Sequence, residues 1–124
     1  MRLLLDSNVV VWMLSNPRRL NDRVSGIIAN GHNELFVSTA SLLEITSKAA
    51  TGRLVFNAPM REDLAATCEW LPVQANHALL VQALPPIHKD PFDRVIVAQA
   101  MIEEMTLITG DRRLLDYGVP VILT

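Results

Sequence analysis

The chain has 124 residues, a formal net charge of −2 at pH 7 and a single cysteine, Cys68. A chain of this length builds one hydrophobic core, so we expect a single domain over residues 1–124. No apolar run reaches the length of a bilayer span, which argues against a membrane channel or transporter. Asp6 interrupts the apolar run after Arg2 that would otherwise suggest a secretory signal, and a lone cysteine predicts no intrachain disulfide. We therefore expect a cytoplasmic protein.

The first half of the chain predicts two strands, each followed by helix. Leu3–Leu5 and Leu35–Val37 are short and fully apolar, as expected for strands that are buried on both faces. Capping residues and Asn16-Pro17 set the ends of the helices between and after them. The predicted helices span Ser7–Leu14, Asn21–Ala29 and Ser38–Lys48.

The second half continues the alternation. Asn57-Ala58-Pro59 predicts a turn, Pro85-Pro86 ends a helix, and Asp90-Pro91 is typical of a helix start. The predicted helices are Arg61–Glu69, which includes Cys68, Ala75–Leu84, and one that begins at Asp90 and has Val95–Ile102 as its body. The predicted strands are Leu71–Val73, Thr106–Thr109 and Val119–Leu123.

Strands that alternate with helices predict a three-layer α/β/α sandwich around a five-stranded parallel sheet. Proline is confined to the edges of sheets, so Pro72 and Pro120 place the third and fifth strands there. The strand order 3-2-1-4-5 satisfies this constraint. It also puts the carboxyl ends of the first and fourth strands side by side at the switch point, where such sheets bind ligands.

Four acids are expected at this edge of the sheet. Asp6 directly follows the first strand, and Asp111 follows the fourth. Glu44 lies in the helix after the second strand, and Asp93 lies at the start of the helix before the fourth. We interpret Asp6, Glu44, Asp93 and Asp111 as candidate catalytic and metal-binding residues.

Each acid also has a structural interpretation that the sequence leaves open. Asp6 could cap the helix that follows it, and Glu44 could complete a capping box with Ser41. Asp93 could only complement the dipole of its helix, and Asp111 could cap a short turn.

Four ionised carboxylates in one crevice repel one another and take up protons unless cations compensate them. An all-oxygen ligand set without cysteine or histidine favours Mg²⁺, or Mn²⁺ as its substitute, over zinc. Two such ions can activate a water molecule and stabilise both the attacking and the leaving oxygen of a phosphodiester displacement. We therefore expect metal-dependent phosphodiester hydrolysis without a protein nucleophile.

The charge balance is compatible with a nucleic-acid substrate once the candidate site is set aside. Removing these four acids from the 13 leaves nine against 11 Lys and Arg, which is a net charge of +2 for the rest of the chain. The same bases could equally be ordinary solvated charge. Our predicted secondary contacts are Ser7 and Asn8 beside Asp6, and Lys89, Arg94 and Arg112 for substrate phosphate.

The three histidines show no pairing that would support metal-independent RNA cleavage by an acid and a base. His32 lies in a Gly-His-Asn turn, His77 near a helix start, and His88 in a loop before Lys89. We expect each to be a surface or loop residue, with His88 close enough in sequence to Asp93 to touch substrate.

Four motifs occur in order along almost the whole chain: Leu-Leu-Leu-Asp-Ser-Asn, Phe-Val-Ser-Thr-Ala-Ser-Leu-Leu-Glu-Ile, His-Lys-Asp-Pro-Phe-Asp-Arg-Val-Ile and Leu-Ile-Thr-Gly-Asp-Arg. Together they resemble the PIN-domain ribonucleases, most strongly the VapC-type toxins of VapBC toxin–antitoxin pairs. The resemblance implies that Asp6, Glu44 and Asp93 bind metal and that Asp111 is a more variable fourth acid. It further implies a Mg²⁺-dependent endoribonuclease of a type II toxin–antitoxin system, a homodimer, and inhibition by an antitoxin whose tail covers the site.

Position 8 separates the competing hypotheses. Similar sequences often have Thr-His where this chain has Ser7-Asn8, so a role for histidine there is lost while Ser7 keeps a hydroxyl. An aspartyl-phosphate phosphatase needs a second acid at position 8, where this chain has Asn8. A phosphoacceptor receiver domain needs a lysine beyond the last strand, and the sequence shows none there. The remaining alternative is a catalytically silent PIN-like module that binds RNA or protein.

Overall fold

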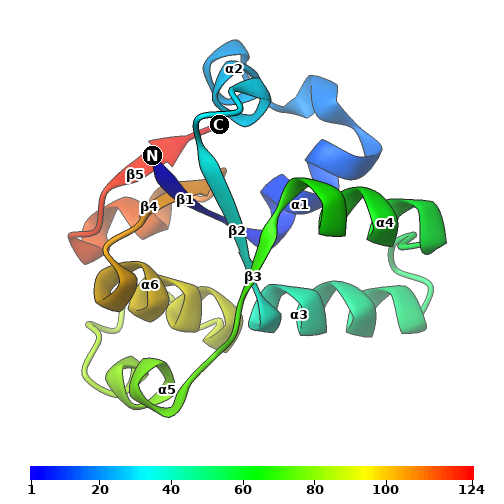
Figure 1. The fold of residues 1–124 in the computed structure, drawn as a ribbon. Coiled ribbons are helices and arrows are strands. Elements are labelled where there is room, and N and C mark those ends of the chain that lie inside the picture. The colour runs from blue at the N-terminus through cyan, green and yellow to red at the C-terminus, as the bar shows by residue number, and fades with distance from the viewer.

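A five-stranded parallel sheet forms the centre of the protein, which a computed structural model describes over residues 1–124 (Figure 1). The strand order is β3-β2-β1-β4-β5, and every pair of neighbours is parallel. The strands are β1 (Arg2–Leu5), β2 (Glu34–Ser38), β3 (Glu69–Leu71), β4 (Thr106–Thr109) and β5 (Val121–Leu123). The predicted fold class and strand order are confirmed.

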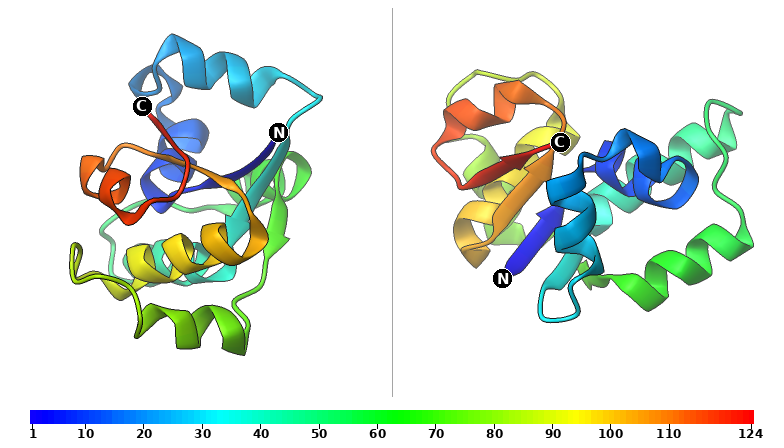
Figure 2. Two further views of the ribbon diagram at one scale, coloured as in Figure 1. Left: turned by 90° about the vertical axis from the view of Figure 1, so that its left-hand side faces the viewer. Right: turned by 90° about the horizontal axis from the view of Figure 1, so that it is seen from above.

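Helices cover both faces of this sheet, with α1 and α2 on one side and α5 and α6 on the other (Figure 2). The helices are α1 (Ser7–Ser15), α2 (Asp22–Ala29), α3 (Thr39–Ala50), α4 (Ala58–Thr67), α5 (Ala75–Val81) and α6 (Pro91–Glu103). Two 3-10 turns, Pro17–Arg19 and Arg112–Tyr117, complete the layers. None of these helices combines the length and the apolar character that crossing a bilayer requires.

The central strand β1 is buried on both faces. Leu3, Leu4 and Leu5 are all 0% exposed. Side chains alternate along a strand, so Leu3 and Leu5 enter the core that contains α1, α2 and α4, while Leu4 enters the core under α6. The uninterrupted leucine run thus follows from the position of β1 at the middle of three layers.

Two predicted boundaries were wrong around α4. Asn57-Ala58-Pro59 is the start of this helix rather than a turn, because the Asn57 side chain accepts a hydrogen bond from the Met60 amide and proline is tolerated in a first turn. Cys68 follows the helix instead of lying within it, and burial raises the pKa of its thiol to about 11. A thiol in that state is a core residue rather than a nucleophile.

The two edge strands also differ from expectation. The strand β3 ends before Pro72, and β5 begins after Pro120, so neither proline lies inside a strand. The Pro120 carbonyl still accepts a hydrogen bond from the Leu107 amide of β4. Both strands lie at the edges as predicted, but the prolines mark their ends rather than forming part of them.

The carboxyl end of β4 is packed tightly against α1. A Cβ atom at Gly110 would lie 2.8 Å from Cη2 and 3.0 Å from Cζ3 of Trp12. The guanidinium of Arg19 lies 4.5 Å from the centroid of the same indole, on which it stacks. The indole is therefore confined between the Arg19 side chain and the chain that leads to Asp111.

We expect Gly110→Ala to lower the free energy of unfolding by about 1–3 kcal/mol, because the added methyl group overpacks the Trp12 contact. The matched control is Gly26→Ala in α2, where nothing lies within 4 Å and alanine is the better helix former. Urea unfolding measures both variants. Equal stability of the two would contradict the packing described here.

Candidate functional site

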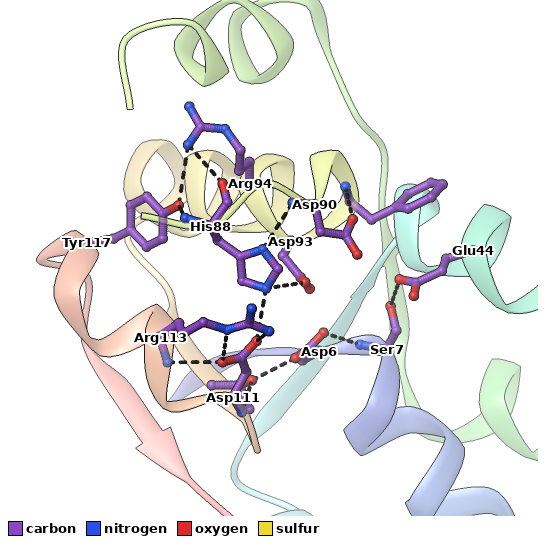
Figure 3. Close-up of polar contacts among 12 residues, drawn as sticks. Asp6, Ser7, Glu44, His88, Asp90, Asp93, Arg94, Asp111, Arg113 and Tyr117 are labelled. Atoms are coloured by element: carbon purple, nitrogen blue, oxygen red, sulfur yellow. Dashed lines mark hydrogen bonds and ion pairs between the residues drawn. The ribbon is translucent and has the colours of Figure 1, made fainter. Parts of the chain in front are cut away.

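A wholly polar pocket of about 190 Å³ lies beyond the carboxyl ends of β1 and β4 (Figure 3). The residues that line it include all four predicted acids; the full set is Asp6, Ser7, Asn8, Glu44, Lys48, His88, Asp90, Asp93, Asp111 and Arg113. The sheet therefore brings Asp6, Glu44, Asp93 and Asp111 together as the sequence suggested. A second cavity of about 350 Å³, beside Met101, contains none of these residues.

Asp6 serves both as a helix cap and as part of this pocket. One carboxylate oxygen, Oδ1, accepts a 2.7 Å bond from the Ser7 amide at the start of α1, and Oδ2 accepts a 2.6 Å bond from the Thr109 hydroxyl. Asp6 is also buried, with only 3% of the residue exposed. Burial raises the pKa of Asp6 above its ordinary value, and the charges of Glu44 and Asp111 add to this effect.

Glu44 is held by one hydroxyl group and one ammonium group at the side of the pocket. Its Oε1 accepts a 2.8 Å bond from the Ser7 hydroxyl, and its Oε2 lies 2.8 Å from Lys48 Nζ. The alternative capping box with Ser41 is absent, because Ser38 caps α3 by accepting from the Ala40 amide. Glu44 therefore faces the pocket with a cation of its own beside it.

Asp93 has no such cation. Asp90 caps α6 by accepting a hydrogen bond from the Phe92 amide. Asp93, in the first turn of the same helix, lines the pocket. Burial, followed by the charges of Asp6, Asp90, Glu44 and Asp111, raises the pKa of Asp93 to about 8. Without a cation, the ionised form of this carboxyl group is therefore disfavoured.

Asp111 is the most fully hydrogen-bonded of the four acids. Its Oδ1 accepts from the backbone and Nε of Arg113, each at 3.0 Å, and its Oδ2 lies 2.8 Å from Arg113 Nη2. The hydrogen bond from the Arg113 side chain is the main reason that the pKa of Asp111 is lowered to about 2. The cap predicted as an alternative for Asp111 is present, and Arg113 already supplies its counter-charge.

Sequence reasoning placed His88 in a loop close to Asp93 but did not select it as a site residue. The imidazole is 7% exposed, and its Nε2 lies 3.0 Å from Asp111 Oδ2 and 3.1 Å from Asp93 Oδ2. His88 is a loop residue as expected, but it is buried rather than at the surface. The sequence signals were its nearness to Asp93 and its place two residues before the Asp90-Pro91 helix start.

His77 was also predicted wrongly as a surface residue, although it lies away from the pocket. It is 0% exposed on α5, where Nδ1 accepts from the Gln74 amide and Nε2 lies 3.0 Å from Glu103 Oε1. His77 thus connects α5 to the end of α6. His32 is exposed as expected.

The predicted secondary contacts divide into two groups. Ser7 and Asn8 line the pocket, whereas Lys89 and Arg112 are exposed residues outside its lining. Arg113, which the sequence analysis did not select, takes the position at the pocket that we expected for its neighbour. Sequence reasoning allowed a short turn after Asp111 but not its 3-10 geometry, and that geometry decides which of the two arginines reaches the pocket.

Arg94 has a structural task in place of the predicted phosphate contact. Its guanidinium donates to the carbonyls of Val81, Leu84 and Pro85 at 2.8–3.1 Å and points away from the acids in Figure 3. The helix α5 ends at Val81 rather than at Leu84 as predicted, and Arg94 binds carbonyls at this end. The same bonds fix the loop that carries His88.

The chemistry of the donor set fits a hard divalent cation. Asp6, Glu44 and Asp93 present carboxylate oxygens to one pocket, and neither Asp6 nor Asp93 has an arginine or lysine partner. Oxygen ligands of this kind suit Mg²⁺ or Mn²⁺. A second, overlapping group consists of His88, Asp93 and Asp111, whose potential ligand atoms lie within 4.8 Å of one another.

Asp93 should make the metal-free protein less stable as the pH rises. Its pKa is about 8 when folded and near 3.8 when unfolded, so between these values the folded state binds more protons and the free energy of unfolding falls with pH. We expect Asp93→Asn to flatten this fall in EDTA, with Asp6 responsible for what remains. Urea unfolding at pH 6 and pH 8 measures the difference.

The exposed Asp116→Asn variant is the control for this measurement and should keep the wild-type dependence on pH. An Asp93→Asn protein with that same dependence would show that Asp93 is ionised at little cost.

Comparison with known proteins gives consistent results. The PIN domain family model matches residues 3–120. The chain is 32% identical over 122 residues to Ribonuclease VapC22 of Mycobacterium tuberculosis, which covers 95% of this chain and 93% of that protein. The fold of the present chain is similar to that of a chain in the DNA-bound VapBC from Salmonella typhimurium, with a TM-score of 0.73, 17% identity and coverage of 98% and 97% of the two chains. A toxin–antitoxin complex from Klebsiella pneumoniae gives a TM-score of 0.68, 20% identity and coverage of 97% and 95%. On this basis the chain belongs to the PIN domain family.

Proposed function

We propose that the protein is a Mg²⁺-dependent endoribonuclease, the toxin of a type II toxin–antitoxin system, with residues 1–124 forming one nuclease domain. The observation that carries this proposal is the convergence of Asp6, Glu44 and Asp93, from three separate segments, on one polar pocket of a PIN domain. The relative named Ribonuclease VapC22 supports the activity, and the solved toxin–antitoxin complexes of the same fold support the biological setting.

In this proposal Asp6, Glu44 and Asp93 hold the ion, and Asp111 contributes less because Arg113 already occupies both of its oxygens. Mg²⁺ is the preferred ion, and Mn²⁺ is its substitute. A divalent cation bound there would lower the pKa of a bound water and offset negative charge on the phosphate oxygens. This leaves no need for a protein nucleophile, and the Ser7 hydroxyl is in any case a donor to Glu44.

The other side chains of the pocket orient these groups and the substrate. Ser7 and Lys48 each hold one oxygen of Glu44, which fixes the direction of that carboxylate. Asn8 is exposed at the pocket and is placed to contact substrate. Arg113 keeps 63% of its side chain exposed while it is bound to Asp111, so the same guanidinium can reach a phosphate of bound RNA.

The expected partners are an RNA substrate, a cognate antitoxin and a second copy of the chain in a cytoplasmic homodimer. The alternative is a PIN-like module that binds RNA or protein without cleaving it. Thermal melting with added Mg²⁺ separates these hypotheses, because an ion that binds only the folded state raises the melting temperature. Stabilisation by Mg²⁺ favours the nuclease, and its absence favours the silent module.

Loss of the Asp6 carboxylate should abolish RNA cleavage without unfolding the protein. We expect Asp6→Asn to lower the cleavage rate by more than the roughly 10–100-fold that loss of an outer-shell partner of a metal costs. Asparagine is itself a good helix cap, so α1 should persist. Gel assays of a fluorescent RNA measure the rate, with Asp116→Asn as the control. Normal cleavage by Asp6→Asn would refute the metal-site assignment.

Arg113 should contribute to RNA affinity where Arg112 does not. We expect Arg113→Gln to weaken RNA binding. The slope of log K against log salt concentration should also fall by about one, the value for one lost phosphate contact. Arg112→Gln is the matched control, since its side chain is exposed but outside the pocket. Fluorescence anisotropy in EDTA measures binding without cleavage. Equal effects of the two variants would contradict a specific phosphate contact at Arg113.

A further inference from the structure

We propose that His88 is a positioning residue of this site, a neutral imidazole whose Nε2–H holds the carboxylates of Asp93 and Asp111 side by side. In this role it neither binds the metal nor transfers a proton. The inference rests on the proposed function, because it assigns a task within the same metal site. The sequence did not predict this role. The proposal is based on the contacts of both ring nitrogens and of the surrounding loop.

The position of the ring proton follows from the contact at the other nitrogen. The backbone N–H of Asp90 donates to His88 Nδ1 at 3.0 Å, so Nδ1 presents a lone pair. A neutral imidazole then carries its only proton on Nε2. Asp90 is itself fixed as the cap of α6, where its side chain accepts a 2.8 Å bond from the Phe92 amide. The start of this helix thus selects the tautomer of His88.

The Nε2 nitrogen of His88 lies between two acids, with its hydrogen bond to Asp111 and a close contact with Asp93. Asp111 Oδ2 accepts at 3.0 Å, and Asp93 Oδ2 lies 3.1 Å away (Figure 3). A metal ligand must offer a lone pair, so coordination by Nε2 would require either an imidazolate or loss of the Asp90 contact. The compact group of His88, Asp93 and Asp111 is therefore two carboxylates joined by a donor rather than three ligands.

The backbone that carries the imidazole is also held in place. The His88 amide donates to the Tyr117 hydroxyl at 2.8 Å, and the His88 carbonyl accepts from Arg94 Nη1 at 3.3 Å. Arg94 also binds the carbonyls of Val81, Leu84 and Pro85, at the end of α5 and in the loop that follows it. These contacts fix the backbone of His88, and its imidazole is 7% exposed within the surrounding protein.

The two acids depend on His88 to different degrees. Asp111 would keep its paired contacts with Arg113 if the imidazole were removed. Asp93 would lose the only basic group within 4 Å of its carboxylate. Without His88, the Asp93 side chain should therefore lose the contact that positions it. An ion that requires Asp93 should then bind more weakly.

Metal binding without RNA tests this role. We expect His88→Ala to weaken Mn²⁺ binding by roughly 10–100-fold in calorimetry, as is typical when an outer-shell partner is lost. His88→Gln should recover most of this affinity and most of the RNA cleavage, because its amide N–H can replace Nε2–H but cannot relay a proton. The exposed His32→Gln is the control. Equal losses in His88→Gln and His88→Ala would overturn the proposal.

The wild-type protein provides a second test that does not depend on how the variants fold. Nitrogen-15 NMR of the three histidines, assigned with His32→Gln and His88→Gln, reports which ring nitrogen carries the proton. We expect His88 to remain an Nε2–H imidazole with and without saturating Mg²⁺. Loss of the Nε2 proton on adding Mg²⁺, or an Nδ1–H tautomer in either state, would overturn the proposal.

These tests separate the inference from the function on which it rests. Wild-type protein that binds Mn²⁺ with His88-dependent affinity, and in which His88 keeps its Nε2 proton, but that leaves RNA intact would refute the nuclease and retain the positioning role. Active wild-type protein whose Mn²⁺ affinity is unchanged in His88→Ala would refute the positioning role alone.

Discussion

Mutual repulsion among carboxylates at the carboxyl ends of β1 and β4 is the constraint around which this site is built. The chain neutralises two of the acids from its own sequence neighbourhood, with Lys48 beside Glu44 and Arg113 around Asp111. Asp6 and Asp93 have no arginine or lysine partner, and burial raises the pKa of both. The negative charge that no arginine or lysine compensates is therefore concentrated between the end of β1 and the start of α6. An added cation would be stabilised most strongly there, which is why the geometry fits a metal-dependent activity.

The fold can hold these acids because the hydrophobic core stabilises the scaffold independently of them. Leucines on both faces of β1 anchor the strand that ends in Asp6. Two helices also begin at the pocket, with Asp6 capping α1 and Asp93 in the first turn of α6. A helix N-terminus favours a negative charge by about 0.3–1 kcal/mol, which partly offsets the burial of each acid. The apolar sheet and the polar site are thus joined at the two helix starts.

Around the acids lies a layer of polar contacts formed by the loop before α6. Arg94 binds the carbonyls at the end of α5, and Tyr117 accepts from the His88 amide. The result is a rigid support for an imidazole that would otherwise lie in a flexible connection. Much of the geometry at Asp93 therefore depends on residues that touch neither the pocket nor an ion.

The sequence by itself determined the sheet order, the caps of α2, α3 and α6 and the four acids that line one pocket, because strand–helix alternation, edge prolines and capping can be read from short stretches of the chain. Local patterns misplaced the prolines of the edge strands and the start of α4, since the same residues are compatible with more than one backbone path. Tertiary structure alone decided the tasks of His88, Arg94 and Arg113. Each depends on where a side chain finds its hydrogen-bond partner, and His88 meets Asp111 across 23 residues of sequence. No local pattern encodes that meeting, because it exists only once the sheet has brought the two loops together.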